Sequence, residues 1–220
     1  MEQKPMSTNR EKNYLIALRK AAETLRDMAP EMVAYKSATV YRPRCGGEGE
    51  WIVPFWGKEY IVAYPAITIH EAGVAGEPPI TTQILILHYL VTADGHPPAD
   101  RWVAFRELPS GLVYDAAFQG RAGQRIAATY GKDKDAFIAA AVSLGGERLT
   151  YGDASFMFRL FPRVSLAVVL YLADEEFAAN ANVLFDAAAA HYLGIEDLAV
   201  LGGLLASRLV GARHPTVTIS

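Results

Sequence analysis

The spacing of hydrophobic positions along the chain predicts most of its secondary structure. Near the N-terminus, apolar side chains recur every three or four residues from Tyr14 to Met28, which predicts an amphipathic first helix that ends near Pro30. Thr8 and Glu11 have the spacing of a capping box, in which a hydroxyl and a carboxylate satisfy backbone donors at a helix start.

From residue 38 the pattern changes to β-branched and aromatic residues interrupted by glycine and proline. Residues 51–55 and 59–64 are separated by Trp56-Gly57-Lys58 and predict a hairpin, and residues 66–70 predict a further strand of an antiparallel meander. The apolar run 80–92 follows Pro78-Pro79 and stops before Gly95, a context that favours a helix over a strand.

The second half of the chain combines helices with one further hairpin. Its predicted elements are a short strand or turn at 102–106, helices near 115–130 and 133–143, strands at 156–161 and 164–172, and helices near 178–193 and 195–211.

Strands and helices are segregated along the chain, which favours an α+β fold over a doubly wound parallel sheet. We expect an antiparallel sheet, made of the N-terminal meander and the later hairpin, packed with helices. The chain has 220 residues, of which 51% are hydrophobic, so it can bury one full core. No repeat or low-complexity linker divides it, and we predict a single domain over residues 1–220, with its core at about 8–211 and short polar tails.

Composition excludes several classes of function. A formal net charge of −3, without a stripe of lysine and arginine, argues against nucleic acid as a partner. No apolar stretch approaches the roughly 20 residues that span a bilayer, and no signal-peptide core is present, so we expect a cytoplasmic protein without a membrane partner. The single cysteine, Cys45, excludes an intrachain disulfide and a four-thiolate zinc site.

The common catalytic and nucleotide-binding motifs are missing from the sequence. It contains neither GxGxxG between a strand and a helix nor GxxxxGK[ST], and it lacks HExxH and GxSxG. The simplest nucleotide-binding, zinc-protease and α/β-hydrolase interpretations are therefore removed. Catalysis by residues that are distant in sequence remains open.

The strongest candidate site is an acidic cluster, Asp174, Glu175 and Glu176, which follows the apolar run 164–172 at a predicted strand-to-helix junction. Unpaired amides and the helix dipole stabilise carboxylates at a helix start, so capping explains one or two of these acids. The others, with Asn180 or Asn182, offer the oxygen ligands that magnesium and calcium prefer, although the spacing does not match a calcium loop. Both the metal content and the cofactor stay open.

Asp186 lies among apolar residues of the predicted helix 178–193, where a carboxylate must find a partner for its charge. Two interpretations are open. Asp186 either forms an ion pair with Arg106, Arg159 or Arg163, or it takes part in ligand binding.

A second candidate segment is 102–111, in which an aromatic-bearing strand leads into a loop with proline and glycine. Trp102, Arg106 and Glu107 lie there, and an arginine can clamp a carboxylate or phosphate with two hydrogen bonds. The alternative is that Arg106 pairs with one of the acids. His88, within the apolar run 80–92, is either a hydrogen-bonded core residue or a ligand-binding residue.

A group of short blocks is distinctive in combination. The blocks are Leu87-His88-Tyr89-Leu90, residues 102–109, Gly145-Gly146 with Asp153, Phe161-Pro162-Arg163, Asp174-Glu175-Glu176-Phe177, Leu184-Phe185-Asp186 and Glu196-Asp197. In these blocks the chain resembles the domain of unknown function family 3786, from about the first helix to residue 210. The resemblance implies no established activity or catalytic residue. Members are similar to proteins of anaerobic bacteria and archaea, some with a cysteine-rich, ferredoxin-like segment, which implies a role beside iron–sulfur or corrinoid proteins by analogy.

The leading hypothesis is a cytoplasmic ligand-binding or accessory protein whose pocket is lined by residues 174–186 and 102–111, with a small molecule or a protein of anaerobic metabolism as its partner. One alternative is an enzyme whose paired carboxylates perform acid–base or metal-assisted chemistry. Another is a scaffold that binds a protein, or a second copy of itself as a homodimer, through the apolar final helix. The candidate ligand-binding residues are Trp102, Arg106, Glu107, Asp174, Glu175, Glu176, Asp186 and His88.

Overall fold

The computed structural model describes residues 8–213 and divides into two compact units. Within these residues, the first unit contains residues 8–96 together with His191–Leu193, and the second contains Pro97–Ala190 together with residues 194–213. The chain therefore passes between the units three times. The α+β prediction is confirmed, because each unit is an antiparallel sheet packed with helices. That the two units together behave as a single domain stays a prediction.

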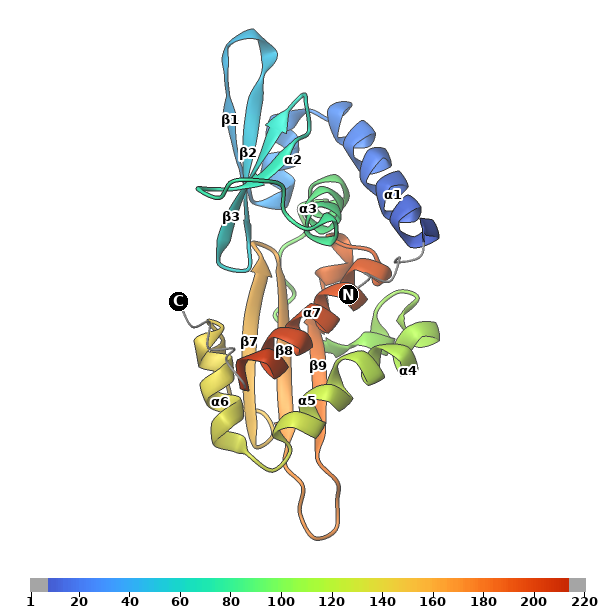
Figure 1. Ribbon diagram of the computed structural model, residues 1–220, viewed down its shortest axis with the longest axis vertical. Helices are drawn as coiled ribbons and strands as arrows, with labels where there is room; N and C mark the ends of the chain where they lie inside the picture. The colour runs from blue at the N-terminus through green and yellow to red at the C-terminus, as the bar shows by residue number, and fades with distance from the viewer. Residues whose placement is uncertain (1–7, 214–220) are drawn as a thin grey trace, which may run out of the picture. The chain divides into compact units, whose positions relative to one another are not determined.

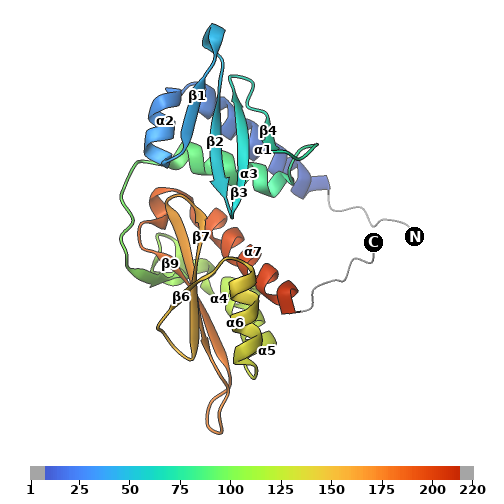
Figure 2. The ribbon, with the colours of Figure 1, turned by 90° about the vertical axis from the view of Figure 1, so that its left-hand side faces the viewer.

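The first unit contains a four-stranded sheet in the order β1-β2-β3-β4, with helices on one of its faces (Figures 1 and 2). Trp51 on β2 is fully buried, and its indole nitrogen donates a 3.0 Å hydrogen bond to the carbonyl of Pro30. The elements are α1 (Thr8–Arg26), α2 (Pro30–Ser37), β1 (Val40–Pro43), β2 (Gly49–Phe55), β3 (Lys58–Tyr64), β4 (Ile69–Glu71) and α3 (Ile80–Thr92).

Most predictions for the first unit are confirmed. The hairpin is β2–β3, with Phe55 paired with Lys58 at the turn, and the apolar run 80–92 is the helix α3. On α1 the predicted apolar face is buried at Ala22 and Leu25 but exposed at Leu15. Pro30 begins a second helix, α2, which was not predicted, because proline fits the first turn of a helix. The side chains of the proposed capping box lie outside the described residues.

The second unit contains a five-stranded sheet in the order β5-β9-β8-β7-β6. Its helices lie on one face of that sheet (Figure 2). The elements are β5 (Trp102–Ala104), α4 (Gly111–Arg121), α5 (Gly123–Tyr130), α6 (Lys134–Ser143), β6 (Glu147–Leu149), β7 (Ala154–Phe161), β8 (Val164–Tyr171), β9 (Asn180–Asp186) and α7 (Ile195–Arg213), with short 3-10 turns η2 (Phe105–Glu107) and η3 (Ala189–His191).

Helix α7 lies in the core of the second unit. Leu198, Leu201 and Leu205 are fully buried, and a Cβ atom added at Gly202 would come within 2.5 Å of the ring of Phe118. Glycine is therefore required for this close approach of α7 to α4. Among the described residues, none of the large apolar side chains that are exposed lies on α7, so the patch that the scaffold alternative requires is not present there.

Three expectations for the second half need correction. The predicted helix near 178–193 is wrong, because residues 180–186 form the strand β9, paired with both β8 and β5. Alanines favour a helix, but Ala181, Val183 and Phe185 alternate with less buried residues and fill the sheet core. The helix predicted at 115–130 is interrupted at Ala122, where α4 ends and α5 begins. The meander and the later hairpin lie in two separate sheets.

Candidate functional site

The acidic cluster 174–176 lies in the loop between β8 and β9, and no helix follows it. The helix-cap interpretation is therefore wrong. Asp174 instead closes a local turn: its Oδ1 accepts hydrogen bonds from the amides of Glu176 at 2.9 Å and Phe177 at 2.6 Å, and its own amide donates to the carbonyl of Phe177 at 3.0 Å. This turn uses Asp174, while Glu175 and Glu176 remain exposed.

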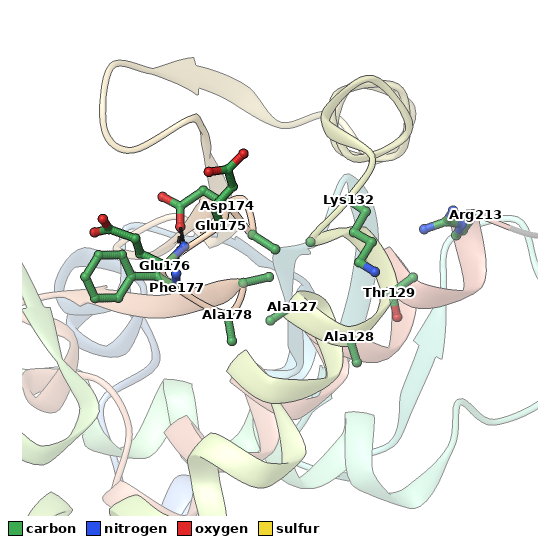
Figure 3. Close-up of a pocket in the computed structure, with 13 residues that line it drawn as sticks. Ala127, Ala128, Thr129, Lys132, Asp174, Glu175, Glu176, Phe177, Ala178 and Arg213 are labelled. Carbon is green, nitrogen blue, oxygen red and sulfur yellow. Dashed lines mark hydrogen bonds between the residues drawn. The ribbon is translucent and has the colours of Figure 1, made fainter.

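The loop forms one side of an open pocket of about 680 Å³, whose floor is the C-terminal turn of α5 (Figure 3). Gly131 fixes the position of the loop. Its carbonyl accepts a 2.9 Å hydrogen bond from the amide of Ala173, and a Cβ atom at Gly131 would lie 2.1 Å from the methyl group of Ala179. The loop can therefore approach α5 this closely only because residue 131 is a glycine.

The charged groups around this pocket do not converge. In Figure 3 the carboxylates of residues 174–176 project from the loop on the side away from Lys132 and Arg213. Arg213 is engaged elsewhere, since its guanidinium is 3.2 Å from Asp133 and lies over the ring of Tyr130. The pocket thus has an alanine-rich floor and a rim of outward-pointing charges.

Asp186 is the last residue of β9, and its surroundings differ from those of the exposed acids. Its side chain is buried, with a residue exposure of 6%. Its Oδ1 accepts hydrogen bonds from the amides of Ala99 at 3.0 Å and Ala188 at 2.8 Å, and its Oδ2 accepts one from Asp100 at 3.0 Å. The burial of this charge is therefore balanced by three backbone donors, which fix the segment before β5 against the end of β9.

Asp186 also lines a pocket of about 180 Å³ on the face of the sheet away from the helices. Side chains alternate between the two faces of a strand, and the adjacent Phe185 packs on Phe118 of α4. Asp186 must therefore point to the opposite face. Trp102, its direct cross-strand partner on β5, lines the same pocket.

The far side of this pocket, which we call the Asp186 pocket, carries two arginines. Arg159 on β7 is paired across the strands with Ser165 on β8, and both line the pocket. Arg163 lines it from the turn between these strands. The register of β8 and β9 places Ser165 beside Asp186, so one row of side chains crosses four strands: Trp102, Asp186, Ser165 and Arg159. Pro98, Asp100, Met157 and Pro162 complete the lining.

The candidate ligand-binding residues that the sequence suggested do not lie in one pocket. Trp102 and Asp186 share the Asp186 pocket, whereas Asp174, Glu175 and Glu176 line the larger one. Arg106 and Glu107 lie outside both linings, in η2, where Glu107 accepts a 2.7 Å hydrogen bond from the amide of Ala104. His88 lies on α3 in the first unit. The single pocket expected from residues 174–186 and 102–111 is thus not assembled.

A cluster that sequence reasoning missed lies in the first unit. The Nδ1 atom of His191 is 2.6 Å from Oδ2 of Asp94, and its ring stacks on that of His96 with centroids 4.1 Å apart. The hydrogen bond from His191, together with one from the His96 amide, lowers the pKa of Asp94 below its ordinary value of 3.8. No sequence signal joins residues that are 97 positions apart.

Among the residues that the structure describes, no group of three or more histidine, cysteine, aspartate or glutamate side chains has the arrangement to hold a metal ion. Between residues 8 and 213, no helix combines the length and the hydrophobicity needed to cross a membrane.

Comparison with known proteins places the chain in a family. Residues 30–208 match the family model described as "Domain of unknown function (DUF3786)", which spans parts of both units, and the chain belongs to this family. No curated protein and no solved structure matches the chain.

Proposed function

We propose that this member of the DUF3786 family is a cytoplasmic binding protein for a small molecule that carries an anionic group, and that the Asp186 pocket is its binding site. The observation that carries the proposal is that the row of side chains across the sheet and Arg163 from the β7–β8 turn bring two guanidinium groups, a hydroxyl and an indole around one cavity. A role beside iron–sulfur or corrinoid proteins, implied by the family resemblance, would be its cellular setting.

The chemistry of the lining supports an anion. Guanidinium groups present several N–H donors in a planar fork that matches a carboxylate or a phosphate, and Ser165 adds a hydroxyl donor between the arginines and Asp186. Trp102, Met157 and the two prolines supply apolar surface for the rest of the molecule. Pockets with a few convergent polar groups on an apolar lining are typical binding sites for small molecules.

Rigidity of the site is a second point of support. Arg159, Ser165, Asp186 and Trp102 are all on strands of one sheet, and sites built on strands hold their geometry better than sites on loops. Asp186 anchors the remaining wall through the amides of Ala99 and Asp100. The pocket is therefore held in place by backbone hydrogen bonds.

The volume restricts the size of the ligand. A metabolite of a few carbon atoms suits a pocket of about 180 Å³.

Binding is better supported than carboxylate-based catalysis. Asp186, the buried acid that the sequence singled out, does not share a pocket with Asp174: Asp174 lies in the loop before β9 and lines the larger pocket, whereas Asp186 ends β9 and lines the smaller one. Both carboxylates already accept backbone hydrogen bonds. The pair is thus not arranged for acid–base work on one substrate.

Isothermal titration calorimetry at low ionic strength tests the proposal with propionate, lactate, alanine and inorganic phosphate, and with the neutral propionamide as a reference. We expect at least one of the compounds with an anionic group to bind and propionamide not to bind. Replacing Arg159 with glutamine removes one charged donor. The affinity of this variant for the compound that binds the wild type should fall about 10- to 100-fold.

Arg148→Gln is the matched control, because Arg148 is an exposed arginine of the same sheet that lies outside the pocket lining. Its affinity should equal that of the wild type. The proposal fails if none of these compounds binds, or if Arg148→Gln weakens binding as much as Arg159→Gln does.

A further inference from the structure

The Asp186 pocket contains a second acid, Asp100, whose negative charge does not favour the binding of an anion. Asp100 lines it from the segment before β5, and its backbone has a φ of 50°, in the left-handed region that side chains other than glycine seldom adopt. Its amide is held by Oδ2 of Asp186 at 3.0 Å. Asp186 thus holds the backbone of Asp100 where Asp100 lines the pocket.

The acids and the arginines lie on opposite sides of the pocket. Asp100 and Asp186 come from the side of β5 and β9, whereas Arg159 and Arg163 come from β7 and the turn that follows it. In the sheet order β9, β8, β7, two strand spacings of about 4.8 Å separate the row positions of Asp186 and Arg159, or roughly 10 Å. A small ligand held between them would experience negative charge at one end and positive charge at the other.

We propose that the ligand of this pocket is a small zwitterion of the amino-acid class, with its ammonium group at Asp100 and its carboxylate at Arg159 and Arg163. This inference rests on the proposed function and names its ligand class. Oxygen atoms of Asp186 already accept three backbone hydrogen bonds, so the carboxylate of the exposed Asp100 receives the ammonium group.

Trp102 strengthens the end of the site that binds the ammonium group. It is the direct cross-strand partner of Asp186, so its indole lies on the same side of the pocket as the two acids. The face of an indole attracts an ammonium group, and this attraction adds to that of the carboxylates. Pure anions lack this contribution and leave the negative charge of Asp100 uncompensated.

Three matched probes test the inference by calorimetry at pH 7: alanine carries both charges, propionate only the carboxylate and ethylamine only the ammonium group. We expect alanine to bind at least 10-fold more tightly than propionate and ethylamine. Asp100→Asn should reduce the affinity for alanine to about that for propionate, and leave propionate binding unchanged or slightly improved.

Asp100→Gly is a second variant, because glycine adopts a φ of 50° without strain and keeps the amide that Asp186 holds. It should lose the preference for alanine in the same way. Asp135→Asn, on the exposed surface of α6, is the control and should behave as the wild type.

The possible results separate this inference from the proposed function. If propionate binds the wild type as tightly as alanine does, or if Asp100→Asn keeps the preference for alanine, the zwitterion inference is overturned while anion binding stands. If none of the compounds with an anionic group binds, the proposed function itself is lost. Tighter binding of ethylamine than of propionate would overturn the assignment of the arginines as the main binding groups.

Discussion

Asp174, in the loop before β9, and Asp186, at the end of β9, use their carboxylates in the same way, yet with different consequences. Each accepts hydrogen bonds from backbone amides. Asp174 is exposed and binds residues two and three positions later, whereas Asp186 is buried and, besides Ala188 two positions later, binds residues 86 and 87 positions earlier. One carboxylate shapes a turn, and the other connects two distant segments of the chain.

The difference shows that burial determines how much such a hydrogen bond contributes. When an exposed acceptor is removed, water replaces it and little free energy is lost. When a buried acceptor is removed, its donors are left without partners, which costs about 1–3 kcal/mol for each unsatisfied group. Asp94 provides an intermediate case, because its contact with His191 is distant in sequence but exposed.

The largest effect is expected for Asp186→Asn. The amide keeps one oxygen acceptor but places an NH₂ group where the carboxylate accepted hydrogen bonds, so backbone donors of Ala99 or Asp100 lose a partner. We expect the free energy of unfolding to fall by about 2–4 kcal/mol, measured by urea denaturation with circular dichroism. A loss below about 1 kcal/mol would contradict the role assigned to burial.

An intermediate and pH-dependent effect is expected for Asp94→Asn. The pKa of Asp94 is lowered in the folded state, so its ionised form stabilises the protein at pH values above its ordinary pKa of 3.8. This stabilisation is lost as the pH falls through the lower folded pKa. Because the side chains of His191 and Asp94 are 41% and 50% exposed, the difference from the wild type should stay below about 1 kcal/mol.

Urea denaturation of the wild type and of Asp94→Asn, at a series of pH values from 6 down to 3, measures this difference. It should be constant near pH 5 and shrink below pH 4. A difference that grows as the pH falls would have the wrong sign for a lowered pKa.

The smallest effect is expected for Asp174→Asn. An asparagine oxygen can still accept the hydrogen bonds from Glu176 and Phe177, since asparagine forms the same local turn. The free energy of unfolding should change by less than about 0.5 kcal/mol, in the same denaturation assay. A loss as large as that of Asp186→Asn would show that the exposed and the buried carboxylate contribute equally to the free energy of unfolding, which would contradict the role of burial.

The sequence predicted elements well where spacing and turn residues agreed, as in the β2–β3 and β7–β8 hairpins and in α3 and α7. It failed at β9, because alanine and asparagine do not favour a strand and only pairing with β5 and β8 imposes one. Tertiary pairing of this kind cannot be read from local propensity.

For the candidate site, the sequence identified the residue but not its surroundings. Asp186 was recognisable as an acid in apolar company, and Arg159 and Arg163 were among the arginines considered for it. The amides of Ala99 and Asp100 carry no side-chain signal, and the positive φ of Asp100 cannot be read from its residue type. The acidic cluster 174–176 was conspicuous in the sequence, yet its member Asp174 closes a local turn.

The division of the chain has a consequence for anyone who expresses its parts. The first unit takes His191–Leu193 from far along the chain, and within this segment Tyr192 and Leu193 are fully buried, with Tyr192 stacked on Tyr89. A gene fragment that stops after His96 encodes neither residue and would yield a unit with a gap in its core. The two units therefore cannot be separated by a single cut, and recombination between relatives would have to exchange both segments of the first unit together.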